Sequence, residues 1–414
     1  MERLREPFAA DWPEAIGLRL SNTRCVLMHR QRTAAQGTRS RLLAWTPWLG
    51  ALMMLAACSP IRVTEPVETE SAPTTAPTTE SSTALTSAVT APPRTTAATI
   101  QAPTTSAVTT EPAPPTIPAP LYRAPLTGLP APAEITRPAA VVKIDNHPNA
   151  LPQWGINMAD VVYEELVEAR LTRLVAIFHS RDAHLIGPIR SARTGDFALL
   201  SNLNRPIFVN SGANEYTERA LRGVDAVNIT DGGSLDNGVF KRSPAKQSPH
   251  NLISDTTRIF AAGSERGGTP PAYFRFRDEG ESLPRATTVS GVDIDFGQIE
   301  ASYRWNAGLG GWTRTQNGSE HTDFDGVRVA PENVIVQFVR YRQSPANRVT
   351  PEPVLTGSGV AWMLSDGQVV QGTWERLSER DVTVFRSDNS VIVPLTPGRT
   401  WIALARKGTA TLVP

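Results

Sequence analysis

The clearest chemical signal in this chain is an arginine-rich segment that precedes a predicted helix. Arg190, Ser191 and Arg193 come directly before a helix that we expect from about residue 194 to 203. Free backbone N–H groups and the helix dipole favour an anion at a helix start. Paired guanidinium groups can also hold a carboxylate or a phosphate at two points. The segment therefore predicts an anion site, unless each arginine pairs with a carboxylate of its own domain. The carboxylates considered for that pairing are Asp145, Glu164 and Glu165.

Other polar side chains stand beside apolar runs. Asp145 ends a predicted strand, which is the usual position of a site in an α/β layer. Together with the arginine segment, these side chains predict a polar cleft that binds a ligand. Its expected lining is Asp145, Asn146, His147, Arg190, Ser191, Arg193, His250 and Asn251.

A second hypothesis uses some of the same residues for catalysis. Two carboxylates and a histidine can perform acid–base hydrolysis. The candidates are Asp145 or Glu165 as general base and His250 as its partner, in a hydrolase acting on cell-wall material. The sequence supports this hypothesis less than ligand binding, because Ser211-Gly212 lacks the G-x-S-x-G context of an esterase.

Metal, cofactor and nucleic-acid functions find no support in the sequence. The six histidines form no H-E-x-x-H spacing, and Asp145 with His147 would supply only two metal ligands. The sequence contains neither a P-loop nor a dinucleotide fingerprint. The 41 Lys+Arg nearly balance the 40 Asp+Glu, whereas a polyanion-binding protein normally carries a basic excess. We therefore expect no metal, no cofactor and no nucleic-acid partner.

Residues 121–280 predict an α/β layered N-terminal domain. Apolar runs over 139–144, 172–178, 206–210 and 224–229 read as strands. Helices are expected over 158–166, capped by Asn157, over 194–203 and over 212–223. Strands that alternate with helices are typical of an α/β arrangement.

Residues 285–414 predict a β-rich C-terminal domain, so that the whole fold class is α+β. Alternating segments such as DVTVFRSDNSVIVPL are separated by Asp, Gly and Asn turns, as in hairpins. Five tryptophans in this half could form a stacking surface for sugars, but packing in the core is the favoured interpretation. They are Trp305, Trp312, Trp362, Trp374 and Trp401.

The start of the chain predicts a lipoprotein signal. Basic residues precede an apolar stretch from Leu42 to Leu55, and small residues then lead to Cys58. The stretch has 14 residues, fewer than the ~20 that a spanning helix needs. Leu55-Ala56-Ala57-Cys58 matches a lipobox, so Cys58 is expected to carry a lipid. We assign 28–58 to this signal and 1–27 to an upstream extension.

Residues 59–120 predict a disordered Thr/Pro-rich tether. Few large apolar residues occur there, so no core can offset the chain entropy. The expected location is the cell membrane, with a lipid anchor on the extracytoplasmic face. The expected partners are the membrane itself and a cell-wall or envelope protein.

The globular part resembles the YerB-like family of bacterial lipoproteins, whose members carry a two-part domain of unknown function. The segments that carry the resemblance are PLTGLP (125–130), VVKIDNHPNALPQWGI (141–156), ADVVYEELVEARLTRLVAIF (159–178), IGPIRSAR (186–193), SPHNL (248–252), HTDFDG (321–326), NVIVQF (333–338) and PGRTWI (397–402). The resemblance implies a lipoprotein location and an α+β fold with an N-terminal and a C-terminal unit. It implies no mechanism.

Overall fold

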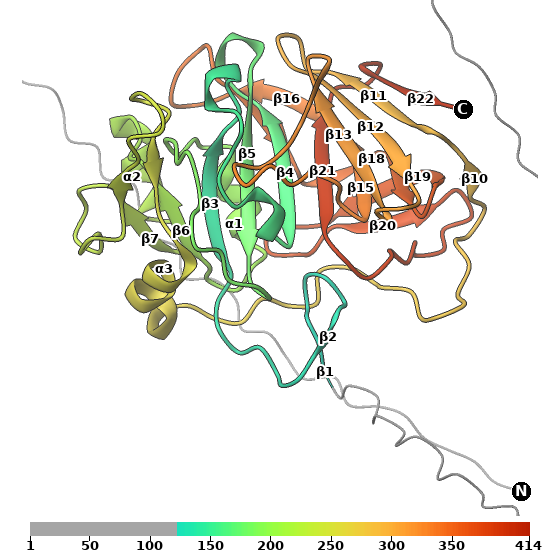
Figure 1. The fold of residues 1–414 in the computed structure, drawn as a ribbon, viewed down its shortest axis with the longest axis horizontal. Helices are drawn as coiled ribbons and strands as arrows, with labels where there is room; N and C mark the ends of the chain where they lie inside the picture. Colours follow the sequence, from blue (N-terminus) through green and yellow to red (C-terminus); the bar gives the residue numbers. More distant parts are fainter. Residues whose placement is uncertain (1–121) are drawn as a thin grey trace, which may run out of the picture. The chain divides into compact units, whose positions relative to one another are not determined.

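Strands dominate the computed structural model, which describes residues 122–414 (Figure 1). They make up 39% of the described residues, against 11% for helices. None of the helices in the described part is long and apolar enough to cross a membrane. The predicted upstream extension, the signal with Cys58 and the tether all lie outside the described residues.

One sheet of eleven strands runs through the molecule. Most neighbouring strands are antiparallel, but β15–β21–β4 and β3–β6–β7 are parallel. In spatial order the strands are β10 (Thr287–Thr288), β19 (Gln368–Arg376), β18 (Gly357–Ser365), β15 (Asn333–Phe338), β21 (Thr400–Ala405), β4 (Val161–Leu166), β5 (Thr172–Phe178), β3 (Ala140–Asp145), β6 (Ile207–Asn210) and β7 (Val227–Thr230), and β20 (Val384–Ser387) pairs with β19.

The large sheet joins the two halves of the sequence. β21 pairs in parallel with β4, so that Ile402 lies opposite Tyr163. The central strands are buried on both faces, as expected for near-continuous β-branched runs such as TRLVAIF in β5. The side chains around this junction therefore come from both halves of the sequence.

A second, five-stranded sheet and three strand pairs complete the β structure. The five-stranded sheet has the order β14 (Ser319–Glu320), β13 (Gly311–Gln316), β12 (Glu300–Asn306), β11 (Gly291–Asp295) and β22 (Ala410–Val413). The pairs are β1 (Tyr122–Arg123) with β2 (Pro130–Ala131), β8 (Lys241–Arg242) with β9 (Leu252–Ile253), and β16 (Arg340–Gln343) with β17 (Pro351–Val354).

The α-helices of the described part are short. Asn214 caps α2 by accepting a hydrogen bond from the Thr217 N–H, and Asp255 caps α3 through the Arg258 N–H. The helices are α1 (Asp196–Leu200), α2 (Glu215–Leu221) and α3 (Thr256–Gly263), with 3₁₀ turns at Pro148–Ala150, Ile156–Met158, Glu168–Arg170 and Ser264–Arg266.

The core has one cluster on each face of the large sheet. The cluster that contains Val142 and Leu174 also includes Val292 and Trp312 of the five-stranded sheet. The other cluster contains Val141 and Val175 together with residues of α1 and α2, namely Leu199, Leu200 and Leu221. Successive residues of a strand point to opposite faces, so neighbours in β3 and β4 enter different environments.

The prediction of an α/β layered N-terminal domain is wrong, because the fold is dominated by sheets. Residues 158–166, expected to be a helix, instead contain β4 between β5 and β21. A short apolar run fits helical and strand periodicity about equally, and the β-branched and aromatic VVY residues favour the strand. The helix expected over 194–203 is only the five residues of α1.

The second half agrees better with its sequence pattern. Residues 285–414 consist of strands and turns and contain no helix. Trp312, Trp374 and Trp401 are buried, and Trp305 and Trp362 pack against the core. The interpretation of these tryptophans as core residues is confirmed.

Candidate functional site

Two loops meet at the carboxyl end of β3. The backbone of Arg190 donates to the Lys143 carbonyl over 2.8 Å, which places the arginine segment beside this strand. The Ile189 N–H donates to the Leu252 carbonyl over 2.7 Å, so β9 lies on the other side of that segment. His250, two residues before β9, is thereby brought to Asp145.

Asp145 is the centre of a group of charged and polar side chains that we name the Asp145 cluster. Its members are Asp145, His147, Arg173, Arg190 and His250. The Asp145 carboxylate is fully buried and accepts from the His250 Nδ1 at 2.7 Å and from the His147 N–H at 3.0 Å. Arg173 Nη1 lies 3.2 Å and Arg190 Nε 3.3 Å from its oxygens. A buried carboxylate that accepts from this many donors holds the surrounding side chains in place.

The two histidines of the cluster stack, with ring centroids 5.0 Å apart. Nδ1 of His147 accepts from the Asn149 N–H over 3.1 Å, so this ring is in a neutral form. Burial, followed by the neighbouring His250, lowers the pKa of His147. Since Nδ1 of His250 is bound to Asp145, Nε2 is the nitrogen that His250 has left for another group.

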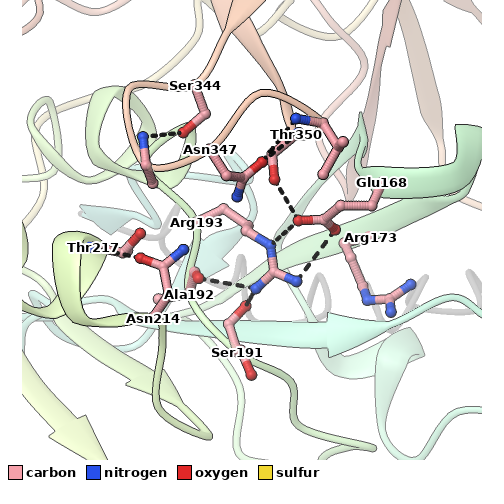
Figure 2. A network of polar contacts seen from close by, with 12 residues as sticks. Glu168, Arg173, Ser191, Ala192, Arg193, Asn214, Thr217, Ser344, Asn347 and Thr350 are labelled. Atoms are coloured by element: carbon pink, nitrogen blue, oxygen red, sulfur yellow. Dashed lines mark hydrogen bonds and ion pairs between the residues drawn. The ribbon is translucent and has the colours of Figure 1, made fainter.

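Arg193 lies in an adjoining network that includes the second half of the chain (Figure 2). Its Nε and Nη2 atoms donate to the two carboxylate oxygens of Glu168 over 2.8 and 3.2 Å. Thr350 also donates to Glu168, over 2.5 Å. Burial alone would raise the pKa of Glu168, but the hydrogen bonds from Arg193 and Thr350 outweigh it and lower the pKa to about 2.

Positive charge is in excess around the cluster. Arg173, Arg190 and Arg193 are accompanied by two carboxylates, Asp145 and Glu168. Burial, opposed by Asp145, and then the charges of the other two arginines lower the pKa of Arg173. Within the described residues, Nε and Nη2 of Arg173 have no hydrogen-bond partner, and Figure 2 shows its guanidinium beside the Arg193–Glu168 pair. An added anion would relieve this excess.

Asn146 and Glu164 lie on the opposite face of the sheet. Asn146 Nδ2 donates to Glu164 over 3.1 Å, and Arg314 binds both oxygens of Glu164 at 2.9 and 3.0 Å. Trp401 Nε1 donates to the same carboxylate over 3.1 Å. These groups are fully buried or nearly so. The structure does not bring Asn146 to the Asp145 cluster, because neighbouring residues leave β3 on opposite sides.

Glu165 is a buried partner of Lys143. Lys143 Nζ binds Glu165 Oε1 and lies 2.5 Å from Asp196 Oδ1. Burial raises the pKa of Glu165 to about 7, Lys143 opposes that rise and Asp196 adds to it. For Lys143 the two carboxylates outweigh burial and raise its pKa. Glu165 therefore contacts this lysine, and not His250 as the hydrolase hypothesis requires.

The remaining predicted residues, Ser191 and Asn251, differ in their contacts. Ser191 Oγ lies 3.4 Å from Ser211 Oγ. Asn251 Oδ1 accepts from Arg242 over 3.0 Å, and Asn251 Nδ2 donates to the Ser243 carbonyl over 3.4 Å, so these side-chain contacts are with residues 242 and 243. Asp145, His147, Arg190 and His250 thus come together, Ser191 and Arg193 adjoin them, and Asn146 and Asn251 do not. Within residues 122–414 there is no group of three metal-ligating side chains.

Comparison with known proteins matches both halves of the chain. Residues 126–269 match the model described as "Protein of unknown function (DUF3048) N-terminal domain", and residues 292–402 match the corresponding C-terminal domain. A Bacillus subtilis (strain 168) protein named "Putative lipoprotein YerB" is 31% identical over 293 residues, which are 68% of this chain and 85% of that protein. This chain belongs to the DUF3048 family.

A solved structure agrees with this assignment. The crystal structure of YerB from Bacillus subtilis matches with a TM-score of 0.61 and 27% identity, and the match covers 71% of this chain and all of that one. The Asp145 cluster lies wholly within the residues matched by the N-terminal DUF3048 model. The family's description assigns it no activity, so the chemistry of the site has to be argued from its own side chains.

Sequence reasoning missed several residues of the site. Arg173 and Lys143 sit inside apolar strands, and a charged residue within a buried run is itself a signal that a partner must exist. Lys246 was also missed. Its Nζ donates to the Ala150 carbonyl over 2.5 Å and lies 4.4 Å from the Trp154 ring centroid, and burial lowers its pKa to about 8. This contact fastens the loop that carries His250.

Proposed function

We propose that this protein is a lipid-anchored lipoprotein of the cell envelope whose Asp145 cluster binds an anionic ligand or an anionic group of a partner. The family membership and the relative's description as a lipoprotein support the anchor. The apolar stretch, the small residues and Cys58 support it independently. The single observation that carries the binding role is that three arginines, Arg173, Arg190 and Arg193, have only two carboxylates, Asp145 and Glu168, as partners.

Arg190 is the donor best placed to reach a ligand. Its side chain is 24% exposed, whereas Asp145 is fully buried and Arg173 is 10% exposed. A guanidinium that is already held by one carboxylate loses little entropy when it binds a second anion. Arg190 and Arg173 would hold the ligand, while Asp145 and His250 would keep them oriented.

The test is calorimetric titration of the detergent-solubilised full chain with inorganic phosphate and with acetate, at constant ionic strength. We expect saturable binding of one of these anions that is about tenfold weaker in Arg190→Gln. Arg123→Gln is the matched control, because Arg123 forms an exposed ion pair with Asp278. Equal anion binding by wild type and Arg190→Gln would refute the proposal.

The lipid anchor has a separate test. Cys58→Ala is expected to move the protein from the membrane fraction to the soluble fraction. Continued membrane retention of this variant would refute lipidation at Cys58. Protease accessibility in intact cells tests the extracytoplasmic side.

One observation favours hydrolysis as a second candidate. The 2.7 Å contact between Asp145 and His250 Nδ1 leaves Nε2 of His250 able to accept a proton from an attacking water. The leaving group would then take that proton. Turnover of cell-wall fragments by wild type and by His250→Gln discriminates the two candidates, since equal turnover excludes His250 as a base.

A further inference from the structure

A cleft of about 1100 Å³ lies next to the arginine segment and has a different character from the Asp145 cluster. Thr194 and Gly195 form its border with that segment. Residues of α1 and α2 line one part, and residues of the β16–β17 pair and of the 378–380 turn line another. We propose that this cleft binds a neutral oligosaccharide chain, independently of the proposed function of the Asp145 cluster.

The charges in the cleft balance. Three arginines and three carboxylates are among its lining residues, so the net charge is zero. They are Arg205, Arg342, Arg380, Asp225, Glu352 and Glu379. A balanced lining gives neither a polyanion nor a polycation an electrostatic advantage. This favours a ligand without net charge.

The size and the polarity of the cleft indicate a chain of several polar units. Single small molecules occupy pockets of roughly 300–1,000 Å³ that are mostly apolar. Here polar side chains outnumber apolar ones among the lining residues. Extended peptides are commonly bound by strand addition or by apolar anchors in pockets. A polar cleft of this volume fits a hydroxyl-rich chain better.

Two side chains give the cleft the groups that a sugar ring requires. Tyr216 on α2 is 44% exposed and offers an aromatic face for the C–H surface of a sugar. Arg342 donates through Nε and Nη2 to Glu352 Oε1 over 2.8 and 2.5 Å, which leaves Nη1 for a hydroxyl group of the ligand.

Glu352 holds Arg342 in position from the buried side of the cleft. Its side chain is only 6% exposed, while that of Arg342 is 65% exposed. The Thr194 hydroxyl donates to the other oxygen of Glu352 and lies 2.7 Å from Ser344 Oγ. A buried carboxylate thus connects the start of α1 to the β16–β17 pair and holds an exposed guanidinium at the cleft.

The experiment is calorimetric titration of the detergent-solubilised full chain with the hexasaccharide and the monosaccharide of β1,4-linked N-acetylglucosamine. The hexasaccharide is expected to bind saturably and the monosaccharide at least about tenfold more weakly, because several subsites act together. Tyr216→Ala and Arg342→Ala are each expected to weaken hexasaccharide binding about tenfold. The far-UV circular dichroism spectrum checks that both variants fold. Tyr216→Ala should also keep the wild-type melting temperature, whereas Arg342→Ala should lower it because Glu352 loses its cation.

The controls separate this cleft from the rest of the surface. Tyr122→Ala removes a tyrosine of nearly equal exposure, 43%, outside the cleft lining, and should leave saccharide binding unchanged. Arg190→Gln should also leave it unchanged, so failure of the anion proposal does not affect this test. Absence of saturable hexasaccharide binding, or equal binding by wild type, Tyr216→Ala and Arg342→Ala, would overturn the proposal.

Discussion

Two ion-pair groups occupy opposite faces of the same strands and differ in how far their charges are matched. On one face, Arg314 and Glu164 are both fully buried and form two hydrogen bonds with each other. On the other face, Asp145 has two arginines, and one of them is 24% exposed. The first group is shielded from solvent and its two charges cancel. The second group is partly exposed to solvent and has donors without a partner.

A structural ion pair differs from a candidate site in whether any of its hydrogen-bond donors remain available to a ligand. A buried pair whose hydrogen bonds are all made has nothing left to offer a ligand. A carboxylate that orients more cations than it neutralises leaves those cations available to another anion. Variants on the first face should therefore affect stability, and variants on the second face should affect binding.

The largest effect is expected from Glu164→Gln. This change leaves Arg314 charged, buried and without its carboxylate, which costs about 3–5 kcal/mol of unfolding free energy. Urea unfolding of the full chain measures it. Glu320→Gln is the control, because Glu320 is 77% exposed and should change stability by less than about 1 kcal/mol. A small loss in Glu164→Gln would mean that the pair is not structural.

Asp145→Asn should lower stability less than Glu164→Gln does, and it should strengthen phosphate binding. Losing the carboxylate leaves Arg173 and Arg190 without their shared anion, at a cost of about 2–3 kcal/mol. The amide oxygen of the replacement still accepts from the arginines and keeps them oriented, while the negative charge that competes with the ligand is gone. Phosphate should therefore bind more tightly than in wild type. Unfolding and titration measure the two effects. Weaker phosphate binding would show that the Asp145 charge is not the competitor.

Glu165→Gln should change the pH dependence of stability. The pKa of Glu165 is raised from its ordinary 4.5 to about 7, first by burial. Between pH 4.5 and 7 the folded chain therefore holds a proton on Glu165 that the unfolded chain releases. This proton stabilises the folded state, and the stabilisation is lost as the pH rises through 7. Gln can still accept from Lys143 and does not ionise. Relative to wild type, the unfolding free energy of the variant should gain on the order of 3 kcal/mol between pH 4.5 and 8.

Unfolding curves at pH 4.5, 6 and 8 measure this gain. A difference between wild type and variant that stays constant with pH would mean that Glu165 does not take up a proton in this range. Glu320→Gln again serves as the exposed control.

The smallest effect on stability is expected from Arg190→Gln. Its side chain is partly exposed, and Asp145 keeps its contacts with Arg173 and His250. The expected loss is about 0.5–1 kcal/mol. Thermal unfolding measures it, with Arg123→Gln as the exposed counterpart. A loss as large as that of Glu164→Gln would mean that the two faces do not differ.

Local features of the fold could be predicted from the sequence. The bounds of β5 agree with the expected 172–178, β3 and β6 overlap predicted apolar runs, and α2 lies within the helix expected over 212–223. The order of strands in the large sheet could not be predicted, since it depends on pairing between distant residues such as Tyr163 and Ile402. The layered α/β prediction failed because the short apolar run of β4 fits helical and strand periodicity about equally.

The candidate site was predicted only in part. Asp145, His147, Arg190 and His250 were expected together, and the structure places them together. The sequence prediction placed Asn146 with them because it did not take into account that neighbouring residues at the end of β3 point to opposite faces of the sheet. The partner of Glu164 could not be foreseen, because Arg314 is 150 residues away.

The most direct test of the account is the unfolding free energy as a function of phosphate concentration at constant ionic strength. A ligand that binds only the folded state stabilises it by RT ln(1 + [L]/Kd). Wild type should gain stability with phosphate, Arg123→Gln should gain equally, and Arg190→Gln should gain little. Equal gains in wild type and Arg190→Gln, or no gain in any of the three, would contradict an anion site at the Asp145 cluster.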